Sequence, residues 1–111
     1  MLSIIIVNWN VRDLLRECLR SIEAGKGDLS LEIIVVDSAS SDDSVAMVRS
    51  EFPSVRLIPC TENVGFPRGN NIGLREAGGD YLLLLNPDTV VVDGALALLV
   101  SYLQVNPDVG A

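Results

Sequence analysis

The chain has 111 residues, with 8 Lys and Arg against 15 Asp and Glu and no His, so its formal net charge is −7. This length suits one domain. The lack of His excludes Ser-His-Asp and Cys-His nucleophile systems and any zinc site with imidazole ligands. The acidic balance argues against a nucleic-acid partner, which would require a basic face.

No apolar run approaches the ~20 residues of a membrane span. The opening apolar run, residues 2–7, lacks the basic flank and the length of a signal peptide. Cys18 and Cys60 form no Cys-x-x-Cys pair, so neither a redox pair nor a metal knuckle is indicated. We therefore expect buried free thiols and a reducing compartment, the cytoplasm.

The first half of the chain alternates between strand and helix patterns. Residues 3–7 form a nearly continuous apolar run, which is typical of a strand buried on both faces of a parallel sheet. A helix follows and ends at residues 25–28; its apolar stripe is Leu14, Leu15, Cys18, Leu19 and Ile22. Residues 33–36 predict a second buried strand that stops at Asp37.

The second half continues the alternation. A polar loop over residues 38–44 precedes a helix that Pro53 stops, and residues 55–58 predict a short third strand. A stretch rich in Gly, Asn and Pro, residues 63–71, is expected to be a loop that runs into a short helix ending at residues 78–79. Residues 81–85 predict the fourth strand and residues 96–103 the last helix, which residues 106–107 would end.

This order predicts a Rossmann-like, three-layer α/β/α fold with a mostly parallel sheet and right-handed crossovers. Ligands of such sheets bind beyond the carboxyl ends of the strands. The polar residues expected there are Asn8, Trp9 and Asn10 after the first strand, Asp37 and Ser38 after the second, Asn63, Gly65, Arg68, Asn70 and Asn71 after the third, and Asn86 and Asp88 after the fourth.

Each acidic residue of these loops has two interpretations. Asp37 could begin a turn or cap the next helix, or its carboxylate could accept the imide N–H of a pyrimidine base. Asp42 and Asp43 fit the N-terminus of a helix, where the macrodipole favours negative charge. Asp88 could belong to a type I turn with Pro87, or hold Mg²⁺ together with phosphate oxygens of a substrate.

The segment from Asn63 to Gly73 is not a G-x-G-x-x-G motif. Its glycines permit close approach of the backbone or a positive φ, which an ordinary loop also requires. The guanidinium of Arg68 suits bidentate binding of a phosphate, but a solvated surface arginine is the alternative.

Four stretches together resemble one family. They read S-I-I-I-V-N-W-N (3–10), E-I-I-V-V-D-S-A-S-S-D-D-S (32–44), E-N-V-G-F-P-R-G-N-N-I-G-L (62–74) and G-D-Y-L-L-L-L-N-P-D-T (79–89). In this order they resemble the N-terminal, nucleotide-sugar-binding half of family 2 glycosyltransferases with the GT-A fold, and most closely the rhamnosyltransferase-like subset. The resemblance spans most of the chain.

The resemblance implies roles for individual residues. Asn8 with its neighbours Trp9 and Asn10 would line the base pocket, and Asp37 would contact a uracil or thymine ring. The residues near the ribose, diphosphate or sugar would be Asn63, Gly65, Arg68 and Asn71, and Ser38 and Asn86 would complete the nucleotide-sugar site. Asp88 would bind the divalent metal, Mg²⁺ or Mn²⁺, in the place of the last acid of the family's D-x-D motif.

The sequence departs from the family pattern at three places. Asn86 stands where many relatives have the first Asp, which leaves one fewer charge to hold a metal in the absence of nucleotide. Ser38 and Asp43 stand where V-D-N and D-G-S are usual. Pro67 and Arg68 replace the small residues often found between the Phe and the Gly.

The resemblance implies an inverting transfer of a sugar from a UDP or dTDP sugar to a glycan or lipid-linked acceptor, in bacterial polysaccharide assembly. The full-length enzyme would work in the cytoplasm, peripherally at the inner face of the membrane. The acceptor half and its catalytic base are expected beyond residue 111. Residues 1–111 would then be a truncated, donor-binding part, inactive alone, whose unpaired sheet edge allows self-association.

Other classes remain to be separated from this interpretation. A non-catalytic nucleotide-binding or interaction domain of the same fold is the main alternative. A phospho-acceptor signalling domain is disfavoured, because its lysine belongs at a late strand end and Lys26 is the only lysine. A dehydrogenase is disfavoured because no G-x-G-x-x-G follows the first strand.

Overall fold

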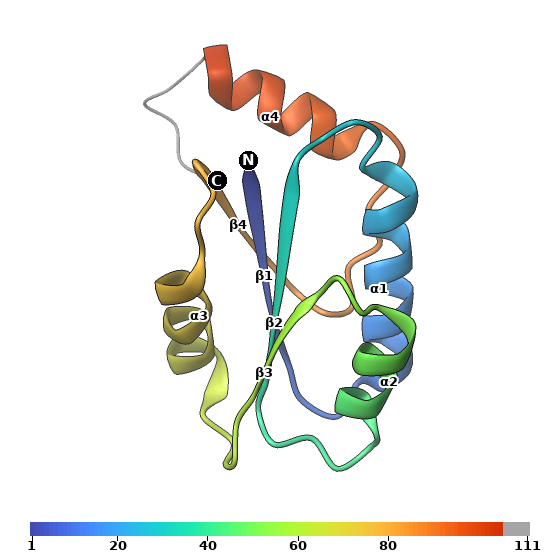
Figure 1. Cartoon of the computed structure of the whole chain (residues 1–111), viewed down its shortest axis with the longest axis vertical. Coiled ribbons are helices and arrows are strands. Elements are labelled where there is room, and N and C mark those ends of the chain that lie inside the picture. Colours follow the sequence, from blue (N-terminus) through green and yellow to red (C-terminus); the bar gives the residue numbers. More distant parts are fainter. Residues whose placement is uncertain (106–111) are drawn as a thin grey trace.

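The computed structural model describes residues 1–105. Strands and helices alternate along them, as the sequence predicts (Figure 1). The elements are β1 (Leu2–Asn8), α1 (Arg12–Gly25), β2 (Leu31–Asp37), α2 (Ser44–Glu51), β3 (Arg56–Pro59), α3 (Gly65–Glu76), β4 (Tyr81–Leu85) and α4 (Ala95–Val105). The expected helix end at residues 106–107 and the expected acceptor half lie outside the described residues.

The four strands form one parallel sheet in the order β3-β2-β1-β4. All seven residues of β1 are buried, which confirms the prediction of a strand covered on both faces. The register pairs Asn8 with Asp37, so the last residues of β1 and β2 lie side by side at the carboxyl edge of the sheet. This edge is at the bottom of Figure 1, whereas α4 crosses the top.

Helices cover both faces of the sheet, which makes the three predicted layers. Helices α1 and α2 lie on one side of the strands and α3 lies on the other (Figure 1). The larger core, on the α1 and α2 side, packs residues such as Leu15, Leu19 and Phe52 against Ile4 and Ile6. The smaller core, on the α3 side, contains Ile5, Val7, Ile34 and Val36.

Helix α3 corrects the prediction that residues 63–71 form a loop, because the helix begins at Gly65. Gly69 and Gly73 are buried on its inner face, four residues apart, and face β1. A Cβ atom on Gly69 would lie 2.7 Å from Cγ1 of Val7, and one on Gly73 would collide with Cγ2 of Ile5. The glycines therefore serve close packing of a helix on a strand, which is the close approach that the sequence allowed.

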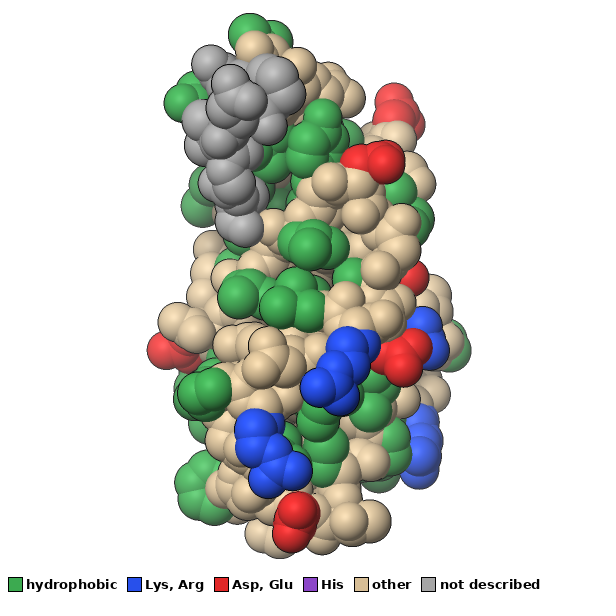
Figure 2. All heavy atoms as spheres, turned by 90° about the vertical axis from the view of Figure 1, so that its left-hand side faces the viewer, with side chains coloured by type: hydrophobic (Ala, Val, Ile, Leu, Met, Phe, Trp, Pro, Cys, Tyr) green, Lys and Arg blue, Asp and Glu red, His purple; other side chains and the backbone are tan. Residues whose placement is uncertain are grey.

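Several smaller features of the structure bear on the sequence. Both cysteines are free, but only Cys18 is buried and Cys60 is partly exposed. Leu14 is 50% exposed and so lies outside the apolar stripe of α1 that the sequence assigned to it. No described helix is long and apolar enough to cross a membrane. Figure 2 shows the α3 side of the molecule, where exposed apolar side chains lie among separate basic and acidic ones.

Candidate functional site

Asp37 is the centre of a hydrogen-bond network at the carboxyl edge. Its side chain is almost completely buried, with 2% of the residue exposed. Oδ1 accepts hydrogen bonds from Nδ2 of Asn8 (3.0 Å) and from the hydroxyl of Ser40 (2.8 Å), and Oδ2 accepts one from the backbone N–H of Ser40 (2.9 Å). The predicted turn at Asp37 is thus present. It holds the carboxylate in a fixed orientation but does not use all of its acceptor capacity.

The loops after β1 and β2 join each other above this network. Oδ1 of Asn10 accepts a hydrogen bond from the N–H of Ser41 (2.7 Å), and the N–H of Asn10 donates to Oγ of Ser40 (3.0 Å). Three non-glycine residues of these loops have a positive φ angle: Asn10 (51°), Ala39 (60°) and Asp43 (67°). Backbone strain of this kind persists only where the surroundings enforce it, and it is frequent at functional sites.

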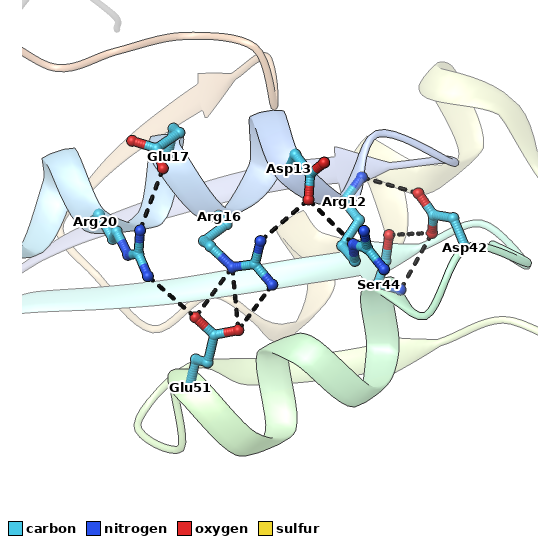
Figure 3. A network of polar contacts seen from close by, with 8 residues as sticks. All are labelled: Arg12, Asp13, Arg16, Glu17, Arg20, Asp42, Ser44 and Glu51. Carbon is cyan, nitrogen blue, oxygen red and sulfur yellow. Dashed lines mark hydrogen bonds and ion pairs between the residues drawn. The ribbon is translucent and has the colours of Figure 1, made fainter.

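Asp42 fixes the helices that follow both loops (Figure 3). Its Oδ2 accepts a hydrogen bond from the N–H of Arg12 (2.9 Å) at the start of α1, and its Oδ1 accepts one from the N–H of Ser44 (3.1 Å) at the start of α2. Burial alone would raise the pKa of Asp42, but the hydrogen bonds from Ser44 and Arg12 outweigh it and lower the pKa. The prediction of a helix N-terminal charge is confirmed for Asp42. Asp43 is the N-cap of α2 and makes no side-chain capping bond.

Ser38 connects the end of β2 to the N-terminus of α3. Its hydroxyl donates to Oδ1 of Asn63 (2.8 Å) and accepts from the N–H of Val64 (2.7 Å). The same oxygen of Asn63 accepts a hydrogen bond from the N–H of Gly65 (3.0 Å), whose φ is +75°. Ser38, Asn63 and Gly65, three of the predicted site residues, are therefore brought together at the start of α3.

Two other predicted site residues lie further along α3. Arg68 and Asn71 are both exposed, and neither makes a hydrogen bond or ion pair with the described residues. Burial and the carboxylate of Asp37 raise the pKa of the Cys60 thiol, and the positive charge of Arg68 opposes this rise.

A hollow of about 450 Å³ lies between the ends of β1 and β4. Its lining consists of Trp9, Val11, Leu14, Phe66, Asn86, Pro87 and Asp88. A second hollow of about 160 Å³ shares Trp9 and Phe66 with the first and reaches Ser38, Asn63 and Gly65. Trp9 and Phe66 are 53% and 55% exposed, so their rings form an apolar wall that a ligand can contact.

Two residues of the larger hollow, Phe66 and Leu14, were not predicted from the sequence. A large aromatic residue among the small residues of a glycine-rich segment is a signal that could have identified Phe66. Leu14 carried no such signal, because its spacing suits the buried stripe of α1.

Residues Asn86 to Thr89 form a turn after β4, closed by a hydrogen bond from the N–H of Thr89 to the carbonyl of Asn86 (3.1 Å). Pro87 is buried, whereas Asp88 is exposed and makes no hydrogen bond or ion pair with the described residues. The thiol of Cys18 lies beneath the turn and contacts the carbonyl of Asn86 (3.9 Å). Burial, together with the charge of Asp88, raises the pKa of Cys18 to about 11. The turn is structural, but the carboxylate of Asp88 is available to a ligand.

Comparison with known families decides what this arrangement belongs to. The family model described as "Glycosyl transferase family 2" matches residues 3–111. The chain belongs to this family. The family was expected from the four sequence stretches.

Two individual proteins show how similar this chain is to known glycosyltransferases. The chain is 34% identical over 101 residues to an N-acetylglucosaminyltransferase of Bradyrhizobium elkanii. The matched region covers 87% of this chain and 55% of that protein. The chain superposes with a TM-score of 0.79 and 30% identity on the mannosyltransferase PcManGT from Pyrobaculum calidifontis in complex with GDP-Man and Mn²⁺, covering 92% of this chain and 32% of that one.

The fold extends to a more distant structure. S. aureus TarS 1-349 in complex with UDP-GlcNAc matches 93% of this chain and 31% of its own, with a TM-score of 0.82 and 22% identity. The chain therefore spans about half the length of the first relative and about a third of the two solved structures.

Asp88 is the candidate metal ligand at the carboxyl edge. The described residues contain no group of three His, Cys, Asp or Glu side chains that could hold a metal ion. Asp88 nevertheless offers a free carboxylate at the rim of the larger hollow, beside Asn86. Mg²⁺ is commonly held by one or two carboxylates and the phosphates of a substrate, with waters completing the octahedron. The residues present fit an ion that binds together with a diphosphate.

Proposed function

We propose that residues 1–111 are the donor-binding part of a glycosyltransferase that moves a sugar from a UDP or dTDP sugar to a glycan or a lipid-linked acceptor. The observation that carries this proposal is that three unlike groups lie along one edge of the sheet, at the carboxyl ends of the neighbouring strands β2, β1 and β4. These are the oriented carboxylate of Asp37, the apolar wall of Trp9 and Phe66, and the free carboxylate of Asp88. The solved structures that share this fold, one in complex with UDP-GlcNAc and one with GDP-Man, support a nucleotide sugar as the ligand.

Each group suits one part of such a donor. Asp37 accepts the imide N–H of the base, because an ionised carboxylate is an acceptor only. The exposed ring of Trp9 offers a flat apolar surface to the nucleoside. Arg68, which has no partner among the described residues, is free to bind the diphosphate with its guanidinium.

Asp88, with Asn86 beside it, would hold Mg²⁺ or Mn²⁺ in the presence of the diphosphate. The ion would supply neutralisation of the negative charge that develops on the leaving diphosphate. The protein's own contribution is to fix the turn that carries Asp88, through the buried Pro87 and the bond between Thr89 and Asn86. A fixed turn places the carboxylate without cost at the moment of reaction.

The remaining parts of the reaction belong to the longer protein. Inversion requires a base that activates the acceptor hydroxyl for attack on the anomeric carbon, and we place this base beyond residue 111. The 111 residues alone would then bind the donor without transferring the sugar. The sequence resemblance favours the rhamnosyltransferase-like subset, acting from the cytoplasm at the inner face of the membrane.

The test is a calorimetric titration of the chain with UDP and with dTDP, each with and without Mn²⁺. Binding of either nucleotide that Mn²⁺ strengthens would support the donor site. Asp88→Ala should abolish the effect of Mn²⁺ and leave the melting temperature unchanged, because the side chain is exposed. A clear loss of stability in this variant would instead assign Asp88 a purely structural role in the turn.

Asp37→Ala separates the base contact from the metal contact. It should weaken UDP and dTDP alike, with or without Mn²⁺, and unchanged affinity would refute the contact between Asp37 and the base. A longer protein that binds donor but neither hydrolyses nor transfers the sugar would favour the alternative, a non-catalytic nucleotide-binding domain.

A further inference from the structure

The two oxygens of Asp37 are not equivalent. Oδ1 accepts two hydrogen bonds, from Nδ2 of Asn8 and from the hydroxyl of Ser40, whereas Oδ2 accepts one, from the N–H of Ser40. Each carboxylate oxygen has two lone pairs that can accept. Oδ1 is therefore saturated by the protein itself, and Oδ2 retains one free acceptor position.

Asn8 acts on Asp37 and not on a ligand. It is fully buried, and its Nδ2 is used by Asp37 and Ser40, so the base-pocket contact that the sequence assigned to Asn8 is replaced by a contact with Asp37. Its NH₂ group must face Asp37, because the opposite orientation would place its carbonyl oxygen against the carboxylate. The cost of this orientation is visible: Oδ1 of Asn8 is buried without a hydrogen-bond partner. A leucine of similar size would avoid this cost, so the amide is explained by what its NH₂ does to Asp37.

Ser40 is held in place as firmly as Asn8. Its Oγ donates to Asp37 and accepts from Nδ2 of Asn8 (3.3 Å) and from the N–H of Asn10 (3.0 Å), so every capacity of the hydroxyl is used. The residue before it, Ala39, has a φ of 60°, which turns the chain so that the N–H of Ser40 reaches Oδ2 of Asp37. Ser40 and Asn8 together fix which oxygen remains available.

The number of free acceptor positions bears on which base can bind. Uracil and thymine present a single imide N–H, which one acceptor position satisfies. Guanine presents two neighbouring donors, its ring N–H and its amino group, and pairs best with both oxygens of an open carboxylate. A carboxylate with one saturated oxygen therefore leaves one guanine donor without a partner, and an unpaired buried polar group is strongly unfavourable.

We propose that Asn8 and Ser40 are specificity-determining positioning residues, which saturate Oδ1 of Asp37 and thereby select a uracil or thymine nucleotide over a guanine nucleotide. The inference rests on the proposed function, because it takes Asp37 to contact the base. It adds the reason for the choice of base, and it assigns a role to Ser40 that neither the sequence motifs nor the family match supplies.

The experiment is a calorimetric titration of the 111-residue chain with UDP and with GDP, at one fixed Mg²⁺ concentration, for the native protein and two variants. The native chain should bind UDP more tightly than GDP. Ser40→Ala and Asn8→Leu each free one acceptor position on Oδ1. Each should therefore lower the ratio of UDP to GDP affinity by about tenfold, the effect of one hydrogen bond to a charged group.

Melting temperatures and a matched control separate specificity from folding. Asn8→Leu should keep or raise the melting temperature, since it removes the unpaired oxygen, and Ser40 lies in a partly exposed loop. Ser3→Ala is the control. Ser3 is an equally buried polar residue of β1, at the opposite end of the strand, where its hydroxyl donates to Glu32. This variant should lower the melting temperature and leave the UDP to GDP ratio unchanged.

The outcomes separate the inference from the proposed function. Native binding of UDP with an unchanged ratio in both variants would overturn the inference and leave the donor site intact. An equal loss of UDP and GDP affinity, or a native preference for GDP, would overturn it in the same way. A folded native chain that binds neither nucleotide would contradict the proposed function, and the inference would be rejected with it.

Discussion

The two faces of the sheet are covered in different ways. On the α1 and α2 side, large side chains such as Leu15, Leu19 and Phe52 fill the space between the helices and the strands. On the α3 side, the helix presents Gly69 and Gly73 to β1, so its backbone lies directly against Val7 and Ile5. We call the α1 and α2 side the filled face, because large side chains occupy the space between helices and strands. We call the α3 side the closed face, because the helix backbone lies directly against the strand.

The difference has a functional consequence. Close packing of α3 brings its first residues to the carboxyl edge, where Ser38 contacts Asn63 and Val64 and where Phe66 faces the hollow. On the other side, the start of α1 and of α2 is fixed by Asp42 and not by close approach. The α3 side therefore contributes Phe66 to the candidate site, and the other side contributes Val11 and Leu14 from the start of α1.

The largest expected effect tests the filled face. Leu19→Ala should lower the free energy of unfolding by about 2–5 kcal/mol, because Leu19 is fully buried and its removal leaves a cavity. Urea denaturation measures the change. Leu98→Ala, on the outer face of α4 with 74% exposure, is the control and should have little effect. A similar loss in both variants would show that burial does not distinguish these positions.

The next largest effect tests the closed face. Gly73→Ala should lower the free energy of unfolding by about 1–3 kcal/mol, because the new methyl group collides with Ile5. Combination with Ile5→Ala should cost less than the sum of the two single variants, since the second change opens the space that the first requires. Gly78→Ala, whose Cβ would meet nothing closer than 3.9 Å, is the control. Strict additivity would argue against the contact.

The sequence predicted the layers better than it predicted the site. The apolar runs of β1 and β2 specify buried parallel strands whatever their neighbours are, so the fold follows from local patterns. Gly65 and Gly69 of α3 were predicted to lie in a loop, because a helix that packs through its backbone has the composition of a loop. Their spacing of four residues was the available signal.

The partners of Asp37 show why the site was less predictable. Asn8 is 29 positions away in the chain and becomes a neighbour only through the strand register. The sequence therefore placed both residues at one edge but could not show that one saturates an oxygen of the other. Of the residues expected at this edge, Trp9, Asn86 and Asp88 line one hollow, whereas Asp37 and Asn71 line neither hollow.

A smaller effect concerns the charge that fixes α1 and α2. The pKa of Asp42 is lowered from its usual 3.8, so the folded state binds this proton less readily than the unfolded state. Its contribution to stability is therefore present above pH 4 and is lost as the pH falls through the lowered pKa. Asp42→Asn should cost about 1 kcal/mol at pH 7, as for other helix caps.

The difference in melting temperature between the native protein and Asp42→Asn should narrow as the pH falls from 5 to below 3, because the native carboxyl group is then neutral as well. Melting curves over this range measure it. A difference that is constant with pH would mean that the charge of Asp42 makes no contribution to holding the helices.

The smallest effect tests whether the ion pairs of Figure 3 add to the stability of the filled face. Glu51 of α2 binds Arg16 (3.0 Å) and Arg20 (3.4 Å) of α1, and the three side chains are 34%, 27% and 58% exposed. Exposed ion pairs contribute little, since water competes for both charges. Glu51→Gln should therefore lower the melting temperature by only about 3 °C.

This difference should shrink further in 0.5 M NaCl, because salt screens exposed charges. Glu23→Gln is the matched control. It also removes one negative charge, but Glu23 makes no ion pair in the described part of the structure, so its effect on the melting temperature should not depend on salt. If Glu51→Gln destabilised the protein as much as Leu19→Ala, the α1 and α2 face would depend on its charges and not on its packing. The contrast between a filled face and a closed face would then fail.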